Sequence, residues 1–257
     1  MNPERFIQQI SKRAGDIVNG YFGKVKEVRS KRNPTDVVSE ADLHSNYMIV
    51  NEIKKHFPSH GIISEETGEQ KRESPYHWYV DPLDGTFNFT RGIPMFCVMI
   101  GLVWKRRVIL SAIFDPVHRE LYFAKRGKGT FLNGKRIHCS KQSAWENSYG
   151  CGPIELRDEQ CMKFKKNLIQ YARLKPFWVG ADGSAGIAAT SVARGSYDWW
   201  ASFSCGAWDY VAPALILEEA GCKISNAKEK KWYPGDTSIV ASNKFLYPEL
   251  LRLVQDK

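Results

Sequence analysis

Apolar side chains recur three or four positions apart at the start of the chain, and this spacing predicts an amphipathic helix over residues 2–22. The residues that carry the spacing are Phe6, Ile10, Ala14, Ile17 and Tyr21. Asn2 can cap this helix, Pro3 suits its first position, and Glu4 faces the positive end of its dipole. A second helix is expected over residues 41–57, and the side chains expected to face inward are Leu43, Tyr47, Val50 and Phe57.

Shorter apolar runs predict strands in the first half of the chain. They cover residues 61–64, 78–80, 96–103, 108–114 and 119–125. The pair Asn133-Gly134 is the signal of a type I′ turn and predicts a further hairpin. Lys105-Arg106 is expected to form the turn between the strands at 96–103 and 108–114. The first half should therefore place two helices on a mostly antiparallel sheet.

The second half alternates helical stretches with short strands, which is an α/β pattern. The helical stretches are 155–171, 184–194, 209–220 and 248–254, and the strands are 177–179, 198–203, 222–225 and 238–241. The change of pattern near residues 140–147 predicts an N-terminal α+β lobe over 1–143 and a C-terminal α/β lobe over 144–257. No low-complexity linker separates the two, so they should pack as one unit.

Composition is that of a soluble globular protein. The 257 residues are 43% hydrophobic and 12% aromatic, and no apolar run approaches the roughly 20 residues of a membrane span. The N-terminus has no continuous apolar core behind a basic start, as a secretory signal would. We therefore expect a cytoplasmic protein with no membrane partner.

The cysteines and histidines carry no recognisable metal-binding spacing. The six cysteines form no CxxC pair, and the six histidines form no HExxH, so we expect reduced thiols and no zinc site. His56 and His60 are four positions apart, but Pro58 lies between them and makes a shared helical face doubtful.

The net charge of +9 comes from dispersed basic runs. These runs lie at residues 29–32, 105–107, 125–128 and 228–231. A basic field attracts anions, either small phosphate esters or nucleic acid, although a solvated lysine-rich surface explains the same runs. No zinc finger, basic zipper or RRM-type signature is present, so nucleic acid is not an expected partner.

Residues 78–91, WYVDPLDGTFNFTR, hold the most informative pattern. An apolar run ends in Asp81 and Asp84, and burying such carboxylates without a partner is costly. A hard divalent cation such as Mg²⁺ takes oxygen ligands of this kind and leaves positions for water and phosphate. Asp-Pro and Asp-Gly are also ordinary turn signals, so the metal hypothesis depends on further carboxylates in matching positions.

Three such positions exist, and each also has a purely structural explanation. Glu65-Glu66 follows an apolar run, where an exposed pair would simply be solvated. Asp42 has the spacing of a helix-capping pair with Ser39. Asp209 opens an apolar helix, where it favours the dipole but would also aim a carboxylate outward from a buried helix end.

Taken together, the motifs resemble those of the inositol monophosphatase family, which are magnesium-dependent, lithium-sensitive phosphatases of the wider sugar-phosphatase superfamily. The matching segments, in the family's order, are DVVSEAD (36–42), SEE (64–66), DPLDGTFNF (81–89) and WDYVAPALILEEAG (208–221). The resemblance implies a mixed α+β and α/β fold, a layered α-β-α-β-α sandwich of the inositol monophosphatase and fructose-1,6-bisphosphatase type. It also implies a homodimer.

The resemblance further implies a ligand set for two or three Mg²⁺ ions. Glu65, Asp81 and the carbonyl of Leu83 would hold one ion, and Asp81, Asp84 and Asp209 a second. Most of these ligands lie in the N-terminal lobe, and Asp209 lies in the C-terminal one.

The resemblance also implies how water and phosphate are held. Thr86 would orient the metal-activated water, with Asp42 accepting a hydrogen bond from its hydroxyl and Glu65 completing the catalytic set. Glu66 would support the site from behind. The turn at Gly85 and Thr86 would cradle the phosphate with backbone N–H groups.

Substrate contacts are expected mainly from the C-terminal lobe. By resemblance, Ser184 and Ala185 would contact sugar or inositol hydroxyls, beside Asp84, Gly85, Thr86 and Asp209. Ser202 stands where inositol phosphatases typically have a glutamate, which weakens the substrate assignment. Lys31 would lie near the entrance and attract phosphate, although a solvated loop lysine explains it equally well.

The function expected is hydrolysis of inositol monophosphate or a similar small sugar phosphate by metal-activated water. A fructose-1,6-bisphosphatase, or a nucleotide 3′-phosphatase acting on adenosine 3′,5′-bisphosphate, is the alternative within the superfamily. A non-catalytic basic protein that binds polyanions is the alternative from another class. The retained carboxylates argue against the last, because such a protein has no need of them.

Overall fold

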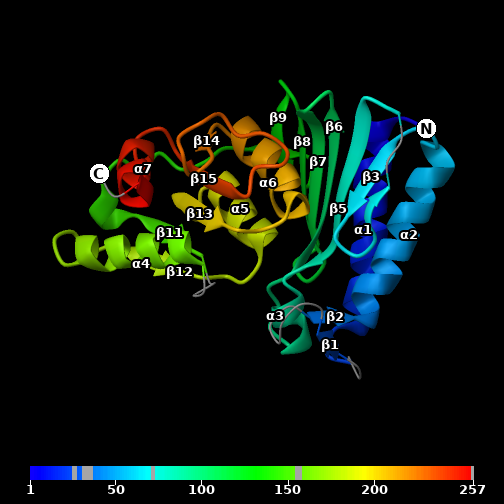
Figure 1. Ribbon diagram of the computed structural model, residues 1–257, viewed down its shortest axis with the longest axis horizontal. Helices are drawn as coiled ribbons and strands as arrows, with labels where there is room; N and C mark the ends of the chain where they lie inside the picture. The colour runs from blue at the N-terminus through cyan, green and yellow to red at the C-terminus, as the bar shows by residue number, and fades with distance from the viewer. Residues whose placement is uncertain (25–27, 31–36, 71–72, 154–157, 256–257) are drawn as a thin grey trace.

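The computed structural model describes residues 1–24, 28–30, 37–70, 73–153 and 158–255, and it stacks helices and sheets in five layers (Figure 1). Helices α1 (Pro3–Tyr21) and α2 (Glu40–His56) cover the outer face of the first sheet. Helices α5 (Ala185–Ala193) and α6 (Ala207–Glu219) lie between the two sheets. Helices α4 (Glu159–Ala172) and α7 (Tyr247–Gln255) cover the second sheet. The predicted α-β-α-β-α layering is confirmed.

The first sheet has eight strands in the order β10-β9-β8-β7-β6-β5-β3-β4. Their bounds are β3 (Gly61–Ser64), β4 (Gly68–Gln70), β5 (Tyr76–Asp84), β6 (Cys97–Trp104), β7 (Arg107–Asp115), β8 (Glu120–Lys125), β9 (Gly129–Leu132) and β10 (Lys135–Ile137). β3 and β5 run parallel, and the other neighbours pair antiparallel. The prediction of a mostly antiparallel sheet is confirmed.

Both predicted turns of this sheet have the left-handed backbone that they require. Asn133 and Gly134 have φ values of 46° and 82°, and Lys105 and Arg106 have φ values of 44° and 66°. Two consecutive positive φ angles define a type I′ turn, which matches the twist of the strands that it joins. A separate small antiparallel pair is formed by β1 (Val28–Ser30) and β2 (Val37–Ser39).

The second sheet has five strands in the order β12-β11-β13-β15-β14. Their bounds are β11 (Tyr149–Cys151), β12 (Trp178–Gly180), β13 (Trp199–Phe203), β14 (Lys223–Ser225) and β15 (Ser238–Ser242). Sequence analysis anticipated four of these strands and missed β11. β11 is short and contains Gly150, where an added Cβ would lie 1.9 Å from the indole of Trp199. A close strand–indole contact of this kind leaves no local pattern in the sequence.

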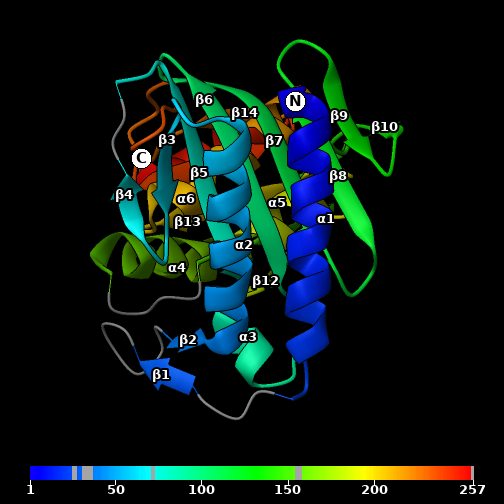
Figure 2. The same ribbon diagram turned by 90° about the vertical axis from the view of Figure 1, so that its right-hand side faces the viewer.

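Helix α1 matches its prediction. The side chain of Asn2 accepts a hydrogen bond from the backbone N–H of Glu4 at 2.8 Å. Its buried stripe includes Phe6, Ile10 and Ala14, but the last turn buries Val18 rather than Ile17. Figure 2 shows α1 and α2 side by side on the outer face of the first sheet.

The predicted inward face of α2 is partly wrong. Leu43 and Tyr47 are 47% and 71% exposed, whereas Val50 is buried. The inward positions at the start of the helix are polar: Asp42, Ser45 and Asn46 are buried instead. Hydrophobicity misleads here because this end of α2 faces the carboxylate-bearing end of β5, where polar groups are hydrogen-bonded rather than excluded.

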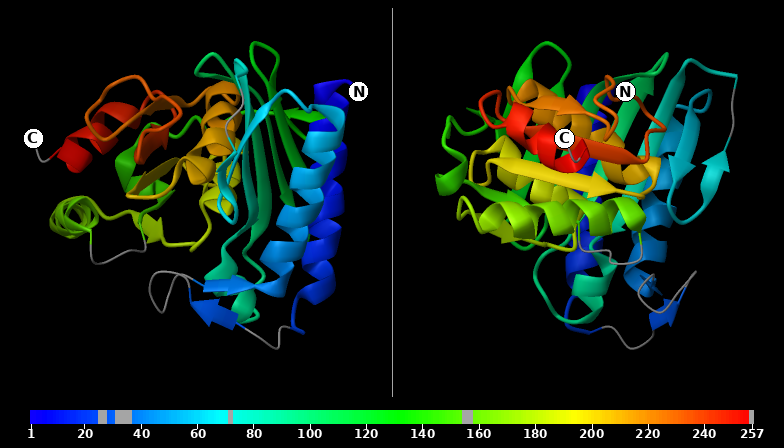
Figure 3. Two further views of the ribbon diagram at one scale, coloured as in Figure 1. Left: turned by 45° about the vertical axis from the view of Figure 1, so that its right-hand side comes forward. Right: turned by 60° about the vertical axis from the view of Figure 1, so that its left-hand side comes forward.

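Helices α5 and α6 bind the two sheets into one structure. The core around them takes Met99 and Tyr122 from the first sheet, Leu215 from α6, and Trp200 and Ile239 from the second sheet. Figure 3 shows the yellow-to-red half of the chain packed on one face of the green strands, while the blue helices cover the other face. The halves therefore pack together, and the division at 143/144 stays a prediction.

All six cysteines are free thiols. In the described ranges, none of the helices is both long enough and apolar enough to cross a lipid bilayer.

Candidate active site

Two carboxylates of the site lie inside strand β5, not after it as the apolar run suggested. Asp81 pairs with Met99 of β6 and Asp84 pairs with Cys97, so three steps along β5 match two along β6. This bulge matters because residues three apart in a regular strand point to opposite faces. The irregularity lets both carboxylates serve the same side, and they are only 1% and 7% exposed.

A third carboxylate reaches the same place from α6. Asp209 lies in the first turn of this helix, and its Oδ2 accepts a hydrogen bond from the backbone N–H of Gly206 at 2.7 Å. One carboxylate oxygen from each of Asp81, Asp84 and Asp209 lies within 4.8 Å of the others. The structure therefore brings Asp209 beside two other predicted ligands, Asp81 and Asp84, that lie far from it in the sequence.

The electrostatics of this cluster are unfavourable without a cation. Burial raises the pKa of Asp81 well above its usual value, and the charges of Glu65, Asp84 and Asp209 raise it further. The pKa of Asp209 is likewise raised well above normal, first by burial and then by Asp84 and Glu65. Clustered carboxylate oxygens are the donor set of a hard dication, so the residues present fit Mg²⁺.

Glu65 approaches the cluster from the end of β3. Its backbone N–H donates to the carbonyl of Val80 at 3.1 Å, which extends the pairing of β3 with β5. Glu65 and its neighbour Glu66 are both half-buried. The supporting role of Glu66 stays a prediction, and Lys31 lies outside the described residues.

Asp84 has a structural role that sequence analysis missed. Its carboxylate accepts hydrogen bonds from the backbone N–H groups of Ala185 at 3.1 Å and Gly186 at 2.7 Å, and from the Ser184 hydroxyl. The thiol of Cys97 donates to it at 3.3 Å. Burial raises the pKa of Asp84, and these hydrogen bonds partly offset the rise. Asp84 therefore ties β5 to the start of α5.

Gly85 is required where β5 turns into the short helix α3 (Thr86–Thr90). Its φ is 88°, and an added Cβ would lie 2.7 Å from the carbonyl oxygen of Met95. A side chain would therefore be strained and would also clash with backbone. The proposed contact of this turn with phosphate stays a prediction.

Thr86 and Asp42 meet as the resemblance implied. The Thr86 hydroxyl lies 3.0 Å from Oδ1 of Asp42 and 2.9 Å from the carbonyl oxygen of Leu83. The other oxygen of Asp42 accepts from the backbone N–H and the hydroxyl of Ser39, at 2.8 Å and 2.6 Å. The capping pair at the start of α2 thus also holds Asp42 against Thr86.

A cavity of about 220 Å³ adjoins the carboxylates. The predicted substrate residues Ser184, Ala185 and Ser202 line it together with Asp84 and Asp209. Sequence analysis did not single out other lining residues, namely Cys151, Asp182 and Cys205.

The two adjacent tryptophans of β13 have different environments. Trp200 lines the cavity. Trp199 is fully buried and stacks on Trp145 in the core, because neighbouring strand residues face opposite sides. Ser202, in the same strand, has its hydroxyl 3.0 Å from that of Tyr210. The wall at Ser202 is therefore neutral.

The sequence model of the inositol monophosphatase family matches residues 3–257, almost the whole chain. The chain belongs to the inositol monophosphatase family. A fructose-1,6-bisphosphatase/inositol-1-monophosphatase of Aquifex aeolicus is 31% identical, over 94% of this chain and 90% of that protein. A protein of Pseudomonas aeruginosa named Nus factor SuhB is 33% identical, over 88% and 85%.

A solved structure of the inositol monophosphatase of Thermotoga maritima superimposes with a TM-score of 0.91 at 28% identity. The superposition covers 100% of this chain and 98% of the Thermotoga maritima chain. The family's fold therefore extends through both sheets of this protein, and the carboxylate cluster lies between elements that all belong to it.

Proposed function

We propose that this protein is a magnesium-dependent phosphomonoesterase that hydrolyses inositol monophosphate or a similar small sugar phosphate. The observation that carries the proposal is the convergence of Asp81, Asp84 and Asp209 beside a small cavity, in a member of the inositol monophosphatase family. A cavity of about 220 Å³ suits a compact substrate, since it is smaller than a typical drug-sized pocket.

Within this proposal, Glu65, Asp81 and the Leu83 carbonyl would hold one Mg²⁺ ion, and Asp81, Asp84 and Asp209 would hold a second. Two or three ions would be bound in all. When bound, magnesium supplies positive charge beside the phosphate and activates water for attack on phosphorus. A cation would also relieve the repulsion within the cluster, because Asp81 and Asp84 are buried and Asp209 lies beside them.

Thr86 and Asp42 orient the attacking water. The hydroxyl of Thr86 has one proton, so it donates either to Asp42 or to the Leu83 carbonyl. When it donates to Asp42, its lone pairs can accept a hydrogen bond from water. Ser39 fixes Asp42 from the opposite side, so the position of the carboxylate that meets the Thr86 hydroxyl is set by buried protein groups.

A second candidate substrate is fructose 1,6-bisphosphate. It is favoured by the name of the Aquifex aeolicus relative and by the neutral Ser202 in the cavity wall. A serine cannot accept two hydroxyl hydrogen bonds with full negative charge as a carboxylate can, so discrimination for inositol is weaker.

The test is phosphate release from inositol 1-phosphate, fructose 1,6-bisphosphate and adenosine 3′,5′-bisphosphate, each with Mg²⁺ and with chelator. The Asp81→Asn variant is the matched control for contaminating phosphatases. We expect turnover of inositol 1-phosphate or of fructose 1,6-bisphosphate. Both the chelator and the Asp81→Asn substitution should abolish this turnover. Turnover of the nucleotide alone would overturn the substrate assignment, and turnover by neither wild type nor variant would overturn the reaction.

Further properties belong to the same proposal. We infer a homodimer, measurable by light scattering, and inhibition by Li⁺, measurable in the same phosphate-release assay. Nucleic acid is not a proposed ligand. Because one relative is named a Nus factor, a gel-shift experiment with RNA is the appropriate check.

A further inference from the structure

Three of the basic runs that are dispersed in the sequence meet at a second cavity, which has a volume of about 480 Å³. Arg106 comes from the turn before β7 and Arg107 from the first position of that strand. Arg126 comes from the turn after β8, and Lys231 from the loop after β14. Glu218, near the end of α6, lies in the same wall. This cavity shares no lining residue with the one beside the carboxylates.

The charge in this cavity is strongly one-sided. Its lining residues include five cationic side chains and one carboxylate, a formal charge of +4. The cationic ones are Arg106, Arg107, Arg126, Lys223 and Lys231. The one carboxylate, Glu218, accepts a hydrogen bond from Arg126 at 2.9 Å, so its charge is already paired with that guanidinium.

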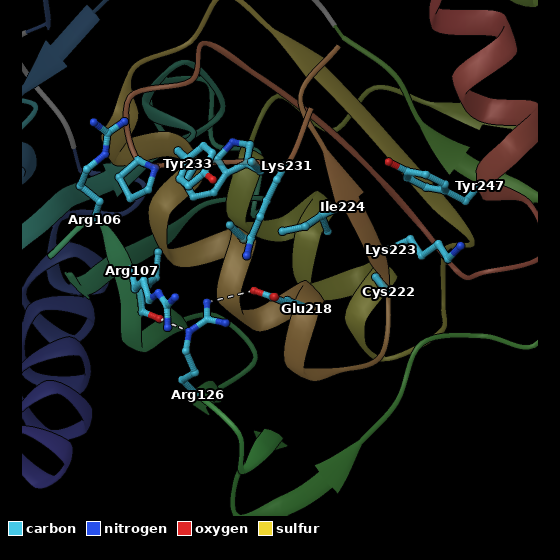
Figure 4. Close-up of a pocket in the computed structure, with 14 residues that line it drawn as sticks. Arg106, Arg107, Arg126, Glu218, Cys222, Lys223, Ile224, Lys231, Tyr233 and Tyr247 are labelled. Atoms are coloured by element: carbon cyan, nitrogen blue, oxygen red, sulfur yellow. Dashed lines mark hydrogen bonds and ion pairs between the residues drawn. The ribbon is translucent and has the colours of Figure 1, made fainter. Parts of the chain in front are cut away.

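Arg126 is fixed by two hydrogen bonds, whereas the neighbouring cations Arg107 and Lys231 are not paired with carboxylates among the described residues. Its Nε also donates to the carbonyl of Val108 at 2.6 Å, which fixes the guanidinium in the wall. Figure 4 shows Lys231 extending from its loop toward Arg126 and Glu218, with Arg107 on the side of Arg126. Within the described part of the chain, neither Arg107 nor Lys231 forms an ion pair with a carboxylate.

Aromatic side chains hold the outer cations in place. The guanidinium of Arg106 lies 5.7 Å from the ring centre of Tyr233, and the ammonium of Lys223 lies 5.8 Å from that of Tyr247. Trp232 also lines the cavity and is 6% exposed, and its indole N–H has no acceptor among the described residues. A buried donor without a partner is uncommon in proteins.

A concave site lined by one sign of charge concentrates counter-ions. Five cations beside a single carboxylate repel one another, and a bound anion would reduce that repulsion. Arginine offers paired N–H donors that match phosphate geometry, and lysine adds a point charge. Two phosphate groups, at roughly −1.5 to −2 each, balance the charge of the lining side chains.

We propose that this cavity is a binding site for a small anion that carries at least two phosphate groups, separate from the carboxylate cluster. Its volume falls in the range of small-molecule pockets. A nucleic-acid strand is the less suitable occupant, since such polymers follow extended basic grooves, whereas these cations surround a single cavity.

The test is calorimetric titration of the full chain with tripolyphosphate and with orthophosphate, both in chelator. Without metal, the carboxylate cluster carries no positive charge and does not compete for these probes. We expect one tripolyphosphate per chain, with orthophosphate about tenfold weaker or more. The Arg107→Gln/Lys231→Gln variant should lose affinity for tripolyphosphate by about tenfold or more.

The matched control is Lys54→Gln/Lys55→Gln, which removes the same charge from exposed positions on α2, across the first sheet. It should change the affinity by less than about twofold. Equal losses in the two variants, or equal binding of the two probes, would show a general surface field and overturn the site. Tighter binding of a single-stranded oligonucleotide, reduced equally in both variants, would overturn the small-molecule assignment.

Discussion

Replacing Asp81 with asparagine should stabilise the metal-free protein and remove its response to magnesium. Asparagine keeps the size of the side chain, and its carbonyl oxygen can still accept the hydrogen bond that the backbone N–H of Leu83 donates to Asp81 at 3.0 Å. The substitution therefore removes one buried charge with little other change. Asp84 is a poorer choice, because both of its oxygens accept hydrogen bonds from α5.

The expected gain follows from the separation of the carboxylates. Oxygens of Asp81, Asp84 and Asp209 lie within 4.8 Å of one another. At an effective dielectric constant of about 20, each ionised pair at that distance costs about 3.5 kcal/mol. Protonation of a carboxylate relieves part of this repulsion. Keeping the proton costs about 1.4 kcal/mol for each pH unit by which the solution lies above the raised pKa. We expect Asp81→Asn to raise the free energy of unfolding of the metal-free protein by about 1–3 kcal/mol. Each kcal/mol should raise Tm by about 2–4 °C.

The gain should grow with pH. The pKa values of Asp81 and Asp209 are raised in the folded state, so the folded protein binds more protons than the unfolded one. The corresponding stability is fully present below the unfolded pKa of about 4 and is lost as pH rises through the folded pKa. Metal-free wild type should therefore lose stability from mildly acidic toward neutral pH, and Asp81→Asn should lose less.

The assay is thermal unfolding in chelator and in saturating Mg²⁺ at several pH values. Asp198→Asn is the control: Asp198 is also buried, but it accepts hydrogen bonds from Ser140 and from the backbone N–H of Tyr149, so this variant should be destabilised. A lower Tm for Asp81→Asn in chelator, with the wild-type response to magnesium retained, would refute the electrostatic argument.

Three further changes test the site and its support. Asp84→Asn should abolish phosphate release and also lower the unfolding free energy by about 1–3 kcal/mol, since the amide N–H₂ would face the N–H donors of α5; unchanged stability by denaturant titration would contradict this. Thr86→Ala should lower kcat about a hundredfold while Thr86→Ser retains most of it, and equal loss in both would assign Thr86 a packing role only. Gly150→Ala should cost about 1–3 kcal/mol or more by urea unfolding, because its Cβ would lie 1.9 Å from Trp199; a cost below about 0.5 kcal/mol would mean that the indole moves freely.

Local patterns predicted most elements of this fold because the relevant forces act over a few residues. The stripe of α1, the I′ turns and the apolar strands of the first sheet each depend on neighbouring side chains. The ligand carboxylates could be nominated for the same reason: Asp81 and Asp84 end an apolar run, and Asp209 opens an apolar helix.

What the sequence could not reveal depends on contacts between distant segments. The inward face of α2 is polar because Ser45 donates to the Pro82 carbonyl at 2.9 Å, and Ser64 donates to Asn46 at 2.5 Å. The bonds from α5 to Asp84 and the gathering of Arg126 and Lys231 likewise join residues about a hundred positions apart. No periodicity records such pairings.

The position of Asp209 depends on a residue with no chemistry of its own. Helix α6 packs on the first sheet directly above Gly101 of β6, where an added Cβ would lie 2.6 Å from a methyl of Val211. The missing side chain lets the helix approach the sheet closely, two residues after Asp209. The distance from Asp209 to Asp81 on the neighbouring strand β5 is set by that approach. The carboxylate cluster is therefore a product of sheet–helix packing as much as of the motifs that carry its ligands.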